Sequence, residues 1–277
     1  MKAITISCFH FAMMKIQKIS LALVLWLLAA NAMAKEELPR LELGISMLAL
    51  RAPDYRGSQK VNDYLLPVPF LRYRGDRFRV DDGLHGIIFD NESLLLTLSG
   101  NLSLPTDDDT PERVGMDRLA VTFEIGPSLN YRFYKFPRSA WWIDLPLRFA
   151  FTLDGDFDHI GWVFQPRLLW RMPATRLEEW ALRFNFGPLF SSDEYHDYYY
   201  TVSDDDALPW RPAFQAESGY SGTRTEFTYS RRFGRYRLGG YVRYDDLSNS
   251  VIEDSPLVTD TSSWLSGIVL TWVFHQR

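Results

Sequence analysis

Side chains alternate between two faces across residues 119–153, and this period of two limits the fold more than any other feature. Odd positions in residues 119–133 and 141–153 are apolar or aromatic. The other row carries small and polar residues, and its charged members are Glu124, Arg132, Asp144 and Arg148. Both segments are more than twice as long as the roughly five or six residues usual in soluble sheets. The pattern predicts a hairpin that spans a bilayer, with lipid on one face and a polar lumen on the other.

The same alternation recurs along the chain and predicts eleven or twelve strands. They cover residues 41–49, 63–74, 77–89, 94–104, 119–133, 141–153, 160–170, 180–190, 223–233, 235–245 and 261–274. Splitting residues 77–89 at Gly83 gives twelve. Bacterial single-chain barrels have even strand numbers. We therefore expect an all-β fold, a transmembrane up-and-down antiparallel β-barrel of about twelve strands.

Composition favours a β-barrel or a large soluble β fold over a helical membrane protein. Aromatic residues make up 15% of the chain, yet its mean hydropathy is only −0.18, whereas a helical membrane protein would be far more apolar. Beyond the N-terminus no run reaches the ~18 apolar residues of a spanning helix.

The N-terminus has the features of a secretory signal peptide. Lys15 and Lys18 precede the apolar residues 19–30, and Ala32 and Ala34 supply the small residues read by a signal peptidase. We predict a signal peptide over residues 1–34 and a barrel over 35–277. A start at Met14 would give a signal of ordinary length. Removal of residues 1–34 takes away the single cysteine, Cys8, and three lysines, which changes the formal net charge from −5 to −8. A chain this acidic is a poor partner for nucleic acid.

Turn lengths predict the orientation. Short turns at Gly75, 90–91, 135–139, 173–179 and Gly234 alternate with longer loops at 52–63, 105–117, 191–218 and 246–260. Short periplasmic turns and long external loops are typical of outer-membrane barrels. We expect the cell outer membrane as the location, with its lipid and lipopolysaccharide as neighbours.

Charged residues on the polar faces of the strands should line the lumen. They are Glu42, Glu124, Arg132, Asp144, Arg148, Arg167, Arg171, Arg183, Arg224, Glu226, Arg232, Arg237 and Arg243. Cross-paired charges would fill and stiffen the lumen, whereas unpaired arginines would favour anionic solutes. We favour the paired arrangement, because twelve strands are fewer than the sixteen to eighteen of open porins.

The sequence gives little support for catalysis, a cofactor or a metal site. After the signal peptide, the histidines are His85, His159, His196 and His275, and we read them as ordinary loop and strand residues. Acidic loops such as 107–109 and 204–206 could bind divalent cations with lipopolysaccharide phosphates, although most such loops are simply solvated. We interpret some aromatic residues as interfacial girdles, namely Trp141, Trp142, Trp170, Trp180, Tyr241, Tyr244 and Trp272.

Several short motifs occur in a fixed order over the predicted mature chain. Their residues are Pro53, Asp54, Tyr55, Gly57 and Ser58, then Leu66 to Phe70, Gly115 and Met116, Tyr198 to Ser203, and Ser255 and Pro256. In these motifs the sequence resembles the MltA-interacting protein family, MipA/OmpV, of Gram-negative outer membranes. The chain differs from most barrels at its end, where three residues follow the aromatic Phe274.

The resemblance implies a structural role. It suggests a non-enzymatic scaffold that binds a lytic murein transglycosylase and a penicillin-binding protein, and so links the outer membrane to peptidoglycan synthesis and hydrolysis. The family brings no catalytic residues. The alternatives are a small-solute porin and a surface adhesin that uses the loop at 191–218.

Overall fold

A computed structural model describes residues 38–75, 78–80, 84–91, 93–103, 110–155 and 157–277. The predicted signal peptide lies outside these residues and stays a prediction. The elements are β1 (Leu41–Pro53), β2 (Val61–Arg74), β3 (Phe78–Val80), β4 (Leu84–Asp90), β5 (Leu94–Leu102), η1 (Pro111–Arg113), β6 (Thr122–Lys135), β7 (Ala140–Thr152), β8 (His159–Phe164), β9 (Arg167–Met172), β10 (Trp180–Ser191), α2 (Asp193–Tyr200), β11 (Gly219–Phe233), β12 (Tyr236–Asp246) and β13 (Ser262–Gln276).

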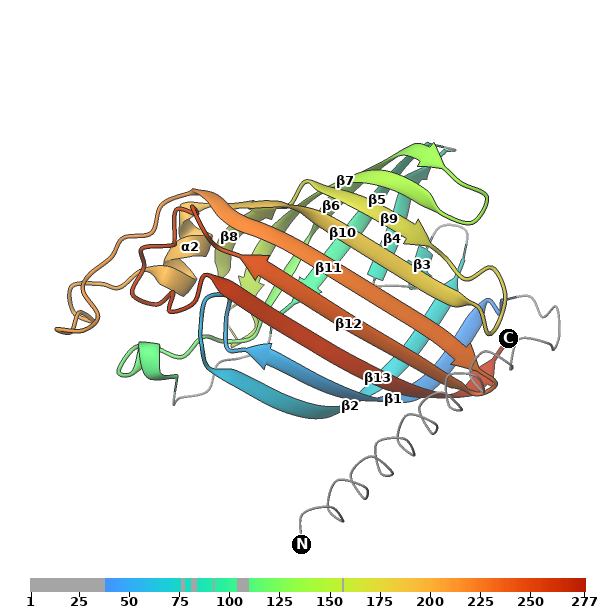
Figure 1. Ribbon diagram of the computed structural model, residues 1–277, viewed down its shortest axis with the longest axis horizontal. Helices are drawn as coiled ribbons and strands as arrows, with labels where there is room; N and C mark the ends of the chain where they lie inside the picture. The colour runs from blue at the N-terminus through green and yellow to red at the C-terminus, as the bar shows by residue number, and fades with distance from the viewer. Residues whose placement is uncertain (1–37, 76–77, 81–83, 92, 104–109, 156) are drawn as a thin grey trace, which may run out of the picture. The chain divides into compact units, whose positions relative to one another are not determined.

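The strands form one closed antiparallel sheet (Figure 1). Each strand pairs with its neighbours in the chain, except that β8 and β9 do not pair with each other, and β1 pairs with β13 to close the ring. Strands β8 and β9 share one place in the wall, because both lie between β7 and β10. The interruption falls at Gln165 and Pro166, where proline has no N–H to donate. The described strands thus occupy twelve wall positions, and the predicted barrel is confirmed.

The strands that form the barrel wall between β2 and β5 are short. Strand β3 pairs with β2 only at Tyr73 and Arg74. The described ladder between β1 and β2, by contrast, runs from Leu41 opposite Tyr73 to Pro53 opposite Val61. The next strands explain this, since β3 has 3 residues and β4 has 7, whereas β2 has 14. The split predicted at Gly83 matches these two short strands, although Gly83 itself lies outside the described residues.

Apolar side chains cover the outside of the wall. Exposed residues include Ile45, Met47, Leu129, Phe149, Phe227, Ile268, Leu270 and Trp272. The opposite face is polar and buried, as in the hydrogen bond between Ser46 and Thr271. This is the reverse of a soluble protein and is the distribution of a barrel in lipid. None of the described helices is long and apolar enough to cross a membrane.

Three local predictions were wrong. Strand β6 begins at Thr122 rather than Leu119, because Leu119 is buried among the loops. The loop at 191–218 contains a helix, α2, whose N-cap Ser192 accepts a hydrogen bond from the backbone N–H of Tyr195. Two of the girdle aromatics face inward: Trp142 lies under two arginines, and Tyr241 hydrogen-bonds Glu226.

Candidate functional site

Long loops and α2 pack together at one end of the barrel as a compact plug. We define the plug as residues 54–60, 110–121, 192–218 and 247–261. Its core contains Tyr55, Leu119, Tyr199, Tyr200, Val202, Ala216, Leu247, Ile252 and Leu257, which pack against Ala150 and Ile160 of the wall. The plug therefore has a hydrophobic core of its own, at the end where the loops are long.

The family motifs meet in this plug, except Leu66–Phe70, which lies in β2. Tyr55 donates a hydrogen bond of 2.8 Å to the carbonyl oxygen of Leu257, and Ser255 donates one of 2.7 Å to that of Tyr200. Burial raises the pKa of Tyr55, so its hydroxyl stays a donor. Gly57 has φ +97°, and Val258 lies 3.2 Å from the place of an added Cβ. Other motif residues also lie in or beside the plug. Asp54 forms hydrogen bonds with Thr110 and Asn62, and Gly115 has φ +83°. The remaining ones are Pro53 at the end of β1, Ser58, which is buried, and Met116 and Pro256, which are half-buried.

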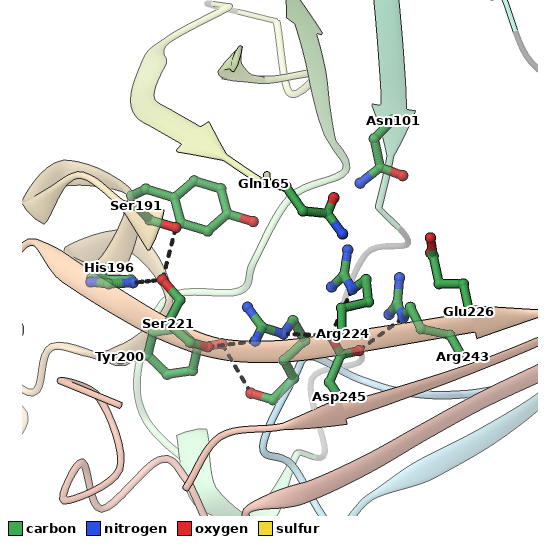
Figure 2. Close-up of polar contacts among 12 residues, drawn as sticks. Asn101, Gln165, Ser191, His196, Tyr200, Ser221, Arg224, Glu226, Arg243 and Asp245 are labelled. Carbon is green, nitrogen blue, oxygen red and sulfur yellow. Dashed lines mark hydrogen bonds and ion pairs between the residues drawn. The ribbon is translucent and has the colours of Figure 1, made fainter. Parts of the chain in front are cut away.

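His196 fastens α2 to β11 (Figure 2). Its Nδ1 lies 2.5 Å from the carbonyl oxygen of Glu217, and its Nε2 lies 2.6 Å from the Ser221 hydroxyl. Nδ1–H donates to the carbonyl oxygen of Glu217, and Nε2 shares a hydrogen bond with Ser221, whose hydroxyl also lies 3.0 Å from that of Ser191. Burial lowers the pKa of His196, and the side chain is 0% exposed. A Ser–His pair sealed in this way cannot meet a substrate, so its geometry is that of a structural contact.

Asp245 is the centre of the charge network beneath the plug. It lies 2.6 Å from Arg224, 2.9 Å from Arg243 and 3.2 Å from Arg56. Figure 2 shows Asp245 with Arg224 and Arg243 beside β11 and β12. Arg56 belongs to the plug, whereas the other two arginines belong to the wall. One carboxylate thus joins the two parts of the molecule.

Predicted lumen residues form further pairs across the strands. Glu124 accepts from Arg148 at 2.8 Å and from the Tyr195 hydroxyl of α2 at 3.3 Å. Asp144 pairs with Arg167 at 2.7 Å, and the same arginine lies 3.6 Å from Glu226. Arg132 and Arg171 lie over the Trp142 ring, and Arg183 is half-buried in β10 opposite Arg171.

A second cluster lies at the short-turn end. Glu42 pairs with Arg232, with Arg74 at 3.2 Å and with Arg237 at 3.5 Å. Arg72 lies beside Glu42 in the β1–β2 register. Among the described residues, one carboxylate again contacts three arginines.

Asp245, Arg56, Arg72 and Arg74 are missing from the lumen residues that the sequence predicted. A signal existed for Asp245, because it lies two residues after Arg243 and therefore shares its face of β12. The position of Arg56 could not be predicted from side-chain alternation, because Arg56 lies in a loop.

A closed antiparallel wall, apolar outside and charged inside, defines an outer-membrane β-barrel protein. The sequence model of the MltA-interacting protein MipA family matches residues 45–274, and the chain belongs to this family. It is a protein of the outer membrane.

The chain path is similar to those of several solved structures. One titled "Bacterial polysaccharide outer membrane secretin" is 10% identical over 84% of this chain and 99% of that chain, with a TM-score of 0.42. The "CymD monoaromatic hydrocarbon channel" is 12% identical over 86% and 90%, with a TM-score of 0.34. OmpT of Vibrio cholerae is 9% identical over 87% and 99%, with a TM-score of 0.35. No curated protein matches the sequence.

Proposed function

We propose that this protein is a non-enzymatic scaffold of the outer membrane that holds a lytic murein transglycosylase, together with a penicillin-binding protein, at its periplasmic turns. The observation that carries the proposal is the plugged, ion-paired lumen. Plug residues reach into the network through Arg56 to Asp245 and Tyr195 to Glu124. The name of the family, MltA-interacting protein, supports the choice of partner.

The same contacts argue against the porin alternative. A selective channel needs a continuous aqueous path with groups that a solute can reach. Here α2 roofs the lumen, and a twelve-position wall encloses less space than the sixteen to eighteen strands of open porins. Planar-bilayer recordings should therefore give no steady open-channel current. A stable conductance that ends when anions are exchanged for larger ones would favour the porin.

The short-turn end is the surface that we assign to the partner. It carries exposed aromatic residues, including Tyr134, Phe136 and Tyr236. Basic residues stand among them, and Arg138 pairs with Glu179 across two turns at 3.4 Å. Exposed aromatic and arginine side chains are common at the centres of protein interfaces.

Photo-crosslinking in intact cells tests this assignment. A photo-reactive benzoyl-phenylalanine would replace Phe136 at the short-turn end or, as a control, Trp210 in the plug, which is also exposed. We expect a murein transglycosylase or a penicillin-binding protein among the products from position 136 but not from position 210. If neither enzyme is captured at position 136, while lipopolysaccharide is captured at 210, the scaffold role is wrong.

A further inference from the structure

The barrel encloses a cavity that the scaffold role does not use. It has a volume of about 520 Å³ and lies between the α2 tyrosines Tyr195, Tyr199 and Tyr200 at one end and Arg72 and Arg237 at the other. Volumes of roughly 300–1,000 Å³ are typical of sites for small molecules.

One wall of the cavity is aliphatic, which is unusual for the inside of a narrow barrel. Its side chains are Leu48 and Leu50 of β1 and Leu265 and Val269 of β13. Two glycines lie beside these side chains and leave them room, because glycine has no side chain. A Cβ added to Gly267 would lie 3.2 Å from Leu50, and one added to Gly239 would lie 2.9 Å from Val269. The aliphatic side chains can therefore lie flat against the wall and leave space in the lumen.

The register places a cationic group directly below this aliphatic wall. On β12, Arg237 precedes Gly239 by two residues, which is one inward-facing step of about 7 Å. Arg237 is 6% exposed, lines the cavity and shares Glu42 with two other arginines. Its Nε–H has no hydrogen-bond partner among the described residues. A buried donor of this kind is costly unless a ligand satisfies it.

The cavity also reaches the short-stranded part of the wall between β2 and β5. Leu102 belongs by alternation to the outer face of β5, yet it lines the cavity and is 62% exposed. The described ladder between β4 and β5 ends at Leu98, and that between β2 and β3 contains Tyr73 and Arg74. Leu102 therefore brings the cavity to the part of the wall where these ladders are short.

We propose that this cavity binds an anionic amphiphile, with its acidic head group on Arg237 and its hydrocarbon chain along Leu48, Leu50, Leu265 and Val269. The Nε–H of Arg237, which has no hydrogen-bond partner among the described residues, selects the anion. The aliphatic wall selects the chain. It extends over four residue steps of β13, from Leu265 to Val269, or ~14 Å, which suits a chain of medium length.

Native mass spectrometry of the purified full-length protein in non-ionic detergent tests the proposal. The probes are decanoate, decyl phosphate and decanol, because the two anions share the charge and the alcohol keeps only the chain. We expect one bound decanoate or decyl phosphate per barrel and at least about tenfold weaker binding of decanol, as the loss of a charged hydrogen bond predicts. A preference for one anion over the other would identify the head group. Equal binding of all three probes would overturn the proposal.

Two variants with matched controls locate the site. Leu50→Trp fills the cavity and should abolish binding, whereas Ala49→Trp, the next residue on the lipid-facing side, should bind normally. Arg237→Gln should weaken anion binding about tenfold and leave decanol unchanged. Slower migration on unheated gels would report any variant that fails to fold. Normal decanoate binding by folded Leu50→Trp would show that the site lies elsewhere.

Discussion

The Tyr55 hydroxyl donates a 2.8 Å hydrogen bond to the carbonyl oxygen of Leu257 and so joins the first long loop to the last. Two hundred and two positions separate these residues in the chain, and both are buried. The plug is therefore one packed unit rather than a set of independent loops. Loss of a single contact should thus change the stability of the whole plug.

Tyr55→Phe should loosen the plug. The substitution leaves the Leu257 carbonyl buried without its donor, which costs about 1–3 kcal/mol. We expect faster proteolysis within residues 192–218, with the barrel itself intact, in a time course with a non-specific protease. Tyr236→Phe is the control, because that side chain is exposed at the other end. Equal cleavage rates in Tyr55→Phe and the wild type would contradict the assigned bond.

Lowering the pH should destabilise the plug through protonation of His196. Burial lowers its pKa in the folded plug below the ordinary value of about 6.5. The opened plug therefore takes up a proton that the closed plug excludes, so plug stability rises with pH between the folded pKa and about 6.5 and falls as pH drops through that window. Proteolysis with an acid-tolerant protease should accelerate from pH 7 to pH 5, and His196→Gln should flatten this dependence. An unchanged slope in the variant would assign the effect to another group.

Asp245→Asn should be far more damaging than a charge loss on the surface. It removes the carboxylate shared by Arg56, Arg224 and Arg243 and leaves buried cations, which typically costs about 3–5 kcal/mol. Asp63→Asn is the control, because its pair with Arg51 is exposed (side chains 71% and 62%) and contributes at most about 1 kcal/mol. Urea unfolding from lipid vesicles, followed by tryptophan fluorescence, measures both free energies. Similar losses would mean that the buried network contributes little.

Gly126→Ala should disturb the contact of β6 with β7. A Cβ at this position would collide with the carbonyl oxygen of Leu147 and lie 2.9 Å from the Cα of Arg148. Backbone atoms cannot yield as a flexible side chain does, so we expect a loss of about 1–3 kcal/mol. Gly100→Ala should be nearly neutral, since its closest atom would be 3.4 Å away. The same unfolding assay compares the two variants.

Periodicity predicted the wall because the side-chain period of a strand is locked to its two faces. Glu124, Asp144 and Arg148 are accordingly buried, while Leu129 and Phe149 are exposed. The same rule could have corrected the girdle assignment of Trp142, since Trp141 and Trp142 are adjacent and must face opposite sides.

The ion-pair partners of the charged side chains across the lumen could not be predicted from periodicity. Arg167 contacts both Asp144 and Glu226, and that pairing depends on how the strands are staggered around the ring. Helix α2 was missed for a different reason: at eight residues it depends on the plug for its stability, although Ser192 with Asp193 and Glu194 is a recognisable helix start.

The pairing of β1 with β13 places the seam of the ring between the two most distant strands of the chain. Backbone bonds link Leu41 and Arg277 in both directions. A growing chain therefore carries two unsatisfied sheet edges until its last strand has been made. Such a polypeptide has to be kept from self-association during export, and its closure step should be slow because it joins residues so far apart.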